Sequence, residues 1–337
     1  MELLQTHTQP LTVAALVTLI AVAAGCGQGE NAGNKKALNV AATVAPITSI
    51  VAAVGGDRIN LRGVIPEGTN SHTYEPKPSI AETLAGADVL YVNGLGLEEP
   101  TVEMARDVMP SGSEIVSLGN RTLPRADWIY DASFPRSGGK PNPHLWTDPG
   151  LAIKYARVVR DDLSKRDPAG RSVYSANYTR FAAAARKLDG AMTKSFATIP
   201  PSNRKLLTYH DGYAYFARDY SWQVVGAIQA SDFEDPTPRE VTRLIDQIRS
   251  EKVPAIFGSE VFPSPVLAQI SRETGVRYVD QLRDDDLPGA PGEPQHSWIG
   301  LMRFDYQVMT EALGGDAKAL RDLRLQATTS DTADYPQ

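Results

Sequence analysis

Short apolar segments alternate with amphipathic ones on both sides of one long helical stretch, and this alternation most constrains the fold. Four strands are expected in the first half, at 38–44, 59–65, 88–93 and 114–118. Four more are expected in the second half, at 205–209, 222–228, 255–258 and 277–282. Short strands that alternate with helices predict βαβ units and parallel sheets.

The long helical stretch separates these two series of strands. Apolar side chains recur at steps of three and four from Tyr174 to Phe196, which predicts one helix of roughly 28 residues, about 42 Å long. We therefore expect an α/β protein with two lobes, each a mainly parallel sheet flanked by helices, joined by one long rigid helix. The expected segments are a signal peptide (1–25), a lipidated tether (26–37), an N-terminal lobe (38–167), the linking helix (168–199), a C-terminal lobe (200–326) and a frayed polar tail (327–337).

The N-terminus indicates export and lipid attachment. The apolar run 11–25 is too short to span a bilayer, which needs about 20 residues, and fits a signal peptide. Cys26 follows Gly25 directly and resembles the cysteine of a bacterial lipobox. This predicts an extracytoplasmic protein, held on the outer face of the cytoplasmic membrane by its N-terminal lipid alone. The alternative is a buried N-terminal helix with a chance cysteine.

Charge and cysteine content exclude several classes of protein. The chain has 34 Lys and Arg against 40 Asp and Glu, a formal net charge of −6, so no nucleic-acid partner is expected. One cysteine excludes a disulfide framework and zinc sites built on paired cysteines.

Three histidines and an acidic run lie where α/β sheets bind ligands. His72, His144 and His210 lie in loops next to expected strands or helices, and Asp284, Asp285 and Asp286 follow the last expected strand. Ligands in open α/β sheets bind beyond the carboxyl ends of the strands. Imidazole and carboxylate without thiolate suit Zn²⁺ or another first-row divalent ion. His296 is expected at the surface.

The motifs around these histidines resemble those of a known family. They are Ser71-His72-Thr73-Tyr74-Glu75-Pro76, Pro143-His144-Leu145-Trp146-Thr147-Asp148-Pro149, Tyr209-His210-Asp211-Gly212-Tyr213 and Ser297-Trp298-Ile299-Gly300. The chain resembles the solute-binding lipoproteins of bacterial ABC importers for zinc and manganese (cluster A-I) over about residues 38–315. The resemblance implies a metal clamped between the lobes by His72, His144, His210 and one carboxylate. The Asp-x-Leu pattern of the family selects Asp285, with Asp284 and Asp286 as alternatives.

The resemblance also shapes what surrounds the ligands. Manganese-type members carry a carboxylate where this chain has His210, which favours Zn²⁺ over Mn²⁺. Asn142 stands where the family often has Asp, which predicts a weakened partner for His144. The 120–143 loop lacks periodicity and contains no histidine. Glu260 is interpreted either as the acceptor for a ligating imidazole or as a carboxylate at a helix start.

The predicted function is capture of Zn²⁺ and its delivery to the membrane subunits of an ABC permease, by a monomer. A metallochaperone is a further candidate partner. Four protein ligands would close the coordination shell, whereas a catalytic zinc keeps one position open, so no enzyme is predicted. The alternatives are a manganese-specific member, a zinc hydrolase with Glu260 as base, a surface adhesin and a binding protein for chelated iron.

Overall fold

The structure is a computed structural model that describes residues 37–229, 236–259, 264–283, 285–324 and 333–335. The expected signal peptide, Cys26 and nearly all of the expected tether lie outside the described residues, as do Glu260 and Asp284.

The first half of the described chain forms a parallel sheet of four strands in the order β2-β1-β3-β4. The strands are β1 (Leu38–Ala42), β2 (Ile59–Gly63), β3 (Val89–Val92) and β4 (Glu114–Ser117). The helices that connect or follow them are α1 (Ala45–Gly55), α2 (Pro78–Ala85), α3 (Glu99–Val108) and α4 (Leu118–Thr122). All four residues of β3 are buried, as expected for an inner strand of a sheet covered on both faces.

The second half repeats this topology, because its parallel sheet has the order β6-β5-β7-β8. Its strands are β5 (Lys205–His210), β6 (Gln223–Gln229), β7 (Ala255–Ser259) and β8 (Arg277–Leu282). Its helices are α7 (Ala214–Tyr220), α8 (Pro238–Glu251), α9 (Pro265–Thr274), α10 (Trp298–Ala312) and α11 (Lys318–Arg321). The prediction of two parallel α/β sheets is confirmed.

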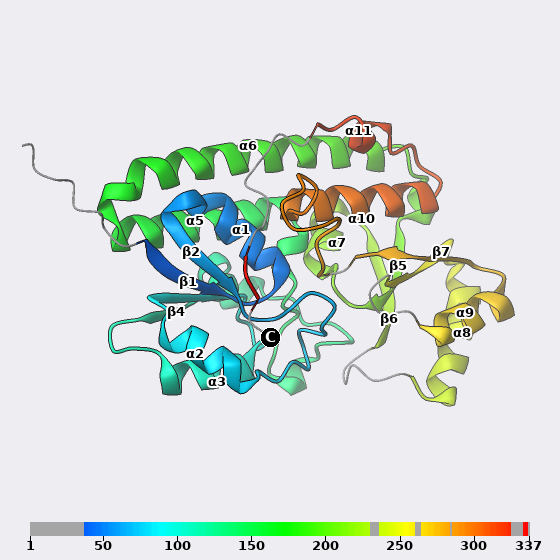
Figure 1. Cartoon of the computed structure of the whole chain (residues 1–337). Helices are drawn as coiled ribbons and strands as arrows, with labels where there is room; N and C mark the ends of the chain where they lie inside the picture. The colour runs from blue at the N-terminus through cyan, green and yellow to red at the C-terminus, as the bar shows by residue number, and fades with distance from the viewer. Residues whose placement is uncertain (1–36, 230–235, 260–263, 284, 325–332, 336–337) are drawn as a thin grey trace, which may run out of the picture. The chain divides into compact units, whose positions relative to one another are not determined.

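Two long helices lie between these halves in the chain, α5 (Pro149–Arg166) and α6 (Arg171–Phe196). The α6 helix has 26 residues and is about 39 Å long, because Pro168–Gly170 form a separate 3-10 turn before it. It packs along α5 and also contacts α1 from the first half and α10 from the second (Figure 1). Its contacts thus extend to both halves, as the apolar stripe predicts. In the described part of the chain, no helix is both long and apolar enough to cross a bilayer.

Within the expected C-terminal tail, Ala333–Tyr335 lie against the edge strand β2. The carbonyl of Asp334 accepts a hydrogen bond from Gly63 N at 3.0 Å, and the Tyr335 and Thr48 hydroxyls lie 2.9 Å apart. An edge strand leaves backbone groups available for pairing. Gly63 also leaves room for the Tyr335 ring, since a Cβ at Gly63 would lie 2.0 Å from it.

Candidate metal centre

The structure brings His72, His144 and His210 together from three distant segments. His72 lies in the loop between β2 and α2, and His144 directly precedes the 3-10 turn Leu145–Thr147 that leads into α5. His210 is the last residue of β5, so this strand is one residue longer than expected. The ligand nitrogens of the three side chains all lie within 4.8 Å of one another.

The spacing of these imidazoles suits a common metal ion. The Nε2 atoms of His72 and His144 are 3.1 Å apart, and two nitrogen ligands of one tetrahedral zinc lie about 3.3 Å apart. The ring centroids of His144 and His210 are 5.0 Å apart, and those of His72 and His210 are 6.0 Å apart. Three nitrogens could therefore face one ion.

Asn142, which is fully buried, orients His144. Its Oδ1 accepts hydrogen bonds from His144 N at 3.1 Å and His144 Nδ1 at 2.9 Å. Its Nδ2 donates to Asp131 Oδ2 at 3.0 Å and to the Asp211 carbonyl at 2.9 Å. Because both amide hydrogens have acceptors, Oδ1 faces the imidazole, Nδ1 carries the proton, and Nε2 presents its lone pair to the cluster. Asn142 therefore makes the hydrogen bonds that orient His144, and the expectation that an amide is a weaker partner than a carboxylate stays a prediction.

Burial keeps two of these imidazoles neutral. It lowers the pKa of His72 and of His144 well below the ordinary histidine value, and the nearby His210 lowers both further. A metal ligand must offer an unprotonated nitrogen. The site is therefore ready for a cation at neutral pH without first losing protons from these two side chains.

Asp285 and Asp286 lie near the three histidines, but their carboxylate oxygens are not part of the same group of converging ligand atoms. Among the described residues, that group consists of the three histidines. The Asp285 Oδ2 atom accepts a hydrogen bond from Ser71 Oγ at 3.1 Å, beside His72. Asp286 Oδ2 instead accepts from Gly68 N at 2.7 Å, and burial raises the pKa of Asp286 to about 7. The role of Asp285 as fourth ligand stays a prediction.

The expectation that His296 lies at the surface is wrong. The residue is 3% exposed, and its Nε2 lies 3.9 Å from Glu67 Oε1. The backbone beside it is held inward, because Trp298 N donates to Ser49 Oγ of α1 at 2.7 Å. His296 does not belong to the histidine cluster.

Two sheets of the same topology, a long helix in contact with both halves of the chain, and a largely buried histidine cluster are the features of helix-bridged substrate-binding proteins. The chain belongs to the ZnuA family, described as zinc-uptake complex component A, periplasmic, whose model matches residues 40–312. The family comprises the substrate-binding proteins of ABC-type metal importers, so this chain is a binding protein and not an enzyme. The hydrolase and adhesin alternatives gain no support.

Individual relatives carry the names of different metals. The manganese-binding lipoprotein MntA of Halalkalibacterium halodurans is 27% identical, covering 88% of this chain and 96% of MntA. The iron-binding protein YfeA of Yersinia pestis is also 27% identical, covering 90% of this chain and 94% of YfeA. The solved structure of the periplasmic zinc-binding protein TroA of Treponema pallidum shares the fold with a TM-score of 0.74 at 23% identity, covering 81% of this chain and 98% of TroA.

Proposed function

We propose that this protein captures Zn²⁺ with His72, His144, His210 and Asp285 and delivers it to the membrane subunits of an ABC permease. The observation that carries the proposal is the convergence of three imidazole nitrogens within 4.8 Å. Two of these side chains, His144 and His210, are buried. Imidazole nitrogens that converge in this way suit Zn²⁺ or another first-row divalent ion.

The donor set favours zinc over manganese. Zn²⁺ accepts tetrahedral nitrogen and oxygen ligands without a geometric penalty, whereas Mn²⁺ favours oxygen ligands and lies at the weak end of the divalent affinity order. A manganese-specific protein is the second candidate, supported by relatives that are named for manganese.

The proposal also covers location and surroundings. Lipid on Cys26 would hold the protein on the outer face of the cytoplasmic membrane, consistent with relatives named as lipoproteins. Glu260 is proposed as the acceptor for a ligating imidazole, which would fix that imidazole's tautomer. A single copy carries all four proposed ligands, so a monomer suffices.

A chelator-competition titration with Zn²⁺ and Mn²⁺ tests the proposal. Wild type should bind Zn²⁺ far more tightly than Mn²⁺. His210→Ala should lose more zinc affinity than the 10–100-fold that is typical when a partner of a ligand is removed. His210→Glu should weaken zinc and narrow the gap between the metals. His296→Ala, which removes a buried histidine outside the cluster, is the matched control and should keep zinc affinity.

The same titration can assign the fourth ligand. Asp285→Asn should weaken zinc binding, while Asp286→Asn should leave it nearly unchanged, because Asp286 is occupied by the backbone of Gly68. Equal or tighter Mn²⁺ binding in wild type, or unchanged zinc affinity in His210→Ala, would overturn the zinc assignment.

A further inference from the structure

We propose that the side chain of Phe134 gates the exchange of metal between the histidine cluster and solvent. The inference rests on the proposed metal site and adds a kinetic role for a residue that offers no ligand atom. Its basis is the place of the Phe134 ring, the way its turn is anchored, and the cavity beside it.

The Phe134 ring lies against two of the three imidazoles. Its centroid is 5.9 Å from that of His72 and 5.9 Å from that of His144. A cavity of about 280 Å³ adjoins this contact, lined among others by His72, Leu97, Phe134, Lys140 and Pro143. His72 is the one histidine of the cluster in this lining. A metal ion that enters through this cavity therefore passes both His72 and the Phe134 ring.

The turn that carries Phe134 is fastened to the metal centre at its base. Asp131 Oδ1 accepts hydrogen bonds from Ser133 N at 3.0 Å and from Phe134 N at 2.8 Å. The other carboxylate oxygen of Asp131 accepts from Asn142, the same amide that orients His144. The ring position is therefore set by the network that sets a ligand.

The far end of the segment is held more weakly. Lys140 pairs with Glu99 of α3, and the two side chains are 53% and 54% exposed. An exposed ion pair contributes only about 0–1 kcal/mol. Between the two anchors, Gly138 and Gly139 have no heavy atom within 4 Å of the position of a Cβ.

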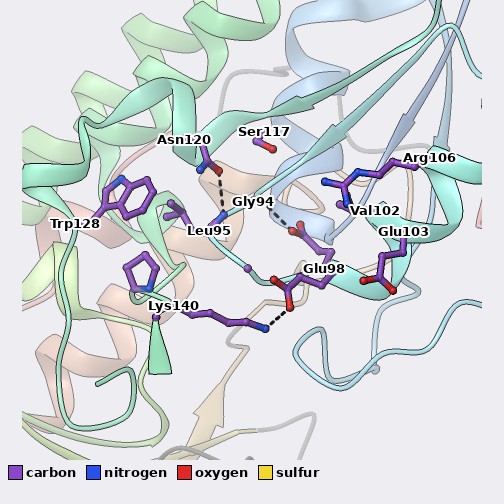
Figure 2. Close-up of a pocket in the computed structure, with 14 residues that line it drawn as sticks. Gly94, Leu95, Glu98, Val102, Glu103, Arg106, Ser117, Asn120, Trp128 and Lys140 are labelled. Atoms are coloured by element: carbon purple, nitrogen blue, oxygen red, sulfur yellow. Dashed lines mark hydrogen bonds and ion pairs between the residues drawn. The ribbon is translucent and has the colours of Figure 1, made fainter. Parts of the chain in front are cut away.

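There is also space on the other side of Lys140. A second cavity of about 310 Å³, shown in Figure 2, shares Leu95, Gly96, Lys140 and Pro141 with the first. The segment after Phe134 thus has a firm base, a weak outer anchor and room beside it. When this segment moves aside, the Phe134 ring gains the space to turn away from the imidazoles while its backbone stays fixed, which is what a side-chain gate beside a mobile segment requires.

The ring's chemistry suits this role. A phenyl ring can neither bind the metal nor hydrogen-bond to its water, so a ring against the imidazoles excludes the water molecules and chelators that would replace a nitrogen ligand. Removal of the ring should lower the barrier for entry and exit alike, since both cross the same constriction. Rates should then change much more than the equilibrium affinity.

The experiment measures zinc release by stopped flow, in which zinc-loaded protein is mixed with excess chelator. Phe134→Ala should release zinc about tenfold faster or more, which corresponds to roughly 1.4 kcal/mol off the barrier, with a much smaller change in equilibrium affinity. Phe134→Tyr keeps the ring and should release zinc slowly, like wild type. Phe304→Ala, at a half-buried phenylalanine of α10, is the matched control and should also behave like wild type.

The outcomes separate this inference from the proposed function. If wild type binds zinc and Phe134→Ala releases it at the wild-type rate, the gate is refuted and the metal site stands. If wild type does not bind zinc, the proposed function fails first. If affinity falls in all Phe134 variants by the same factor as the release rate constant rises, the ring merely stabilises the bound state, and the gate is also refuted. Should Phe134→Ala melt below the assay temperature, Phe134→Leu, with a smaller apolar side chain, decides by the same criterion.

Discussion

Replacement of Asn142 is the sharpest test of how this site is built. The buried amide makes four hydrogen bonds, two to His144 and one each to Asp131 and the Asp211 carbonyl. Asn142→Ala removes all four at once. The imidazole of His144 then loses the acceptor that fixes its tautomer and its orientation.

The structure gives the expected size of two separate effects. Loss of a hydrogen-bond partner of a metal-ligating histidine reduces metal affinity by about 10–100-fold, which is roughly 1.4–2.7 kcal/mol of binding free energy. The amide N–H of His144 and the carbonyl of Asp211 also lose a partner, at about 1–3 kcal/mol each. We therefore expect a loss of roughly 2–6 kcal/mol in the free energy of unfolding of the metal-free protein.

Asn142→Asp separates these effects. A carboxylate can still accept from His144 N and Nδ1, so zinc affinity should fall less than in Asn142→Ala. The same carboxylate would face Asp131 and the Asp211 carbonyl without a hydrogen to donate, so the metal-free protein should still be destabilised at neutral pH.

The assay combines zinc titration at pH 7.5 with urea unfolding of the metal-free protein. Asn177→Ala is the matched control, because Asn177 is also buried and donates to a backbone carbonyl, that of Val54, away from the metal centre. The control should lose stability and keep zinc affinity. Wild-type zinc affinity in Asn142→Ala would refute the reasoning about the His144 tautomer.

Three further predictions concern other parts of the chain. Burial raises the pKa of Asp148 to about 6, above the unfolded value of about 3.9. The folded state therefore binds the proton more tightly, and wild type should lose stability relative to Asp148→Asn as pH rises from about 4 to 6, by up to roughly 3 kcal/mol; parallel stability curves in urea melts would contradict this. Tyr335→Ala should lower the melting temperature by about 2 °C, for roughly 1 kcal/mol lost, and Tyr335→Phe by less, since its ring still covers Gly63; calorimetry that finds no change in Tyr335→Ala argues against the docked tail. Cys26→Ser should move the protein from the membrane to the soluble fraction, because stable anchoring needs the lipid; a membrane-bound variant would disprove lipid attachment.

Much of the fold could be predicted because local pattern and tertiary role coincide. The nearly continuous apolar run at 88–93 predicts an inner strand of a sheet that is covered on both faces, and β3 is such a strand. The stripe of α6 likewise requires a packed face along its length. The docked tail could not be predicted, because its polar sequence has no periodicity. Its position depends on room above Gly63 and on the free edge of β2, which exist only after the sheet has formed.

The candidate site shows a similar division. The three histidines were singled out by their chemistry, by their places near strand and helix ends and by the resemblance of their motifs, while their convergence needed the structure. Asp131 and Phe134 were missed because they lie in a loop without periodicity. A signal was present, since an aspartate two and three residues before the amides it binds is typical of a local turn, but nothing in the sequence shows that the turn touches a ligand.

Hydrogen bonds of the Asn142 side chain link the two halves of the chain. The amide oxygen Oδ1 accepts a hydrogen bond from His144, and the amide nitrogen Nδ2 donates one to the carbonyl of Asp211. Asp211 follows His210, the last residue of β5. The Asn142 side chain therefore links the backbone beside His210 to the imidazole of His144, and both histidines are proposed ligands. A buried amide that leaves any of these hydrogen bonds unmade destabilises the folded protein. A shift of β5 relative to His144 therefore raises the free energy of the protein even before a metal is bound. This linkage favours a site whose nitrogen spacing is set in advance, so that the ion selects among donors already in place.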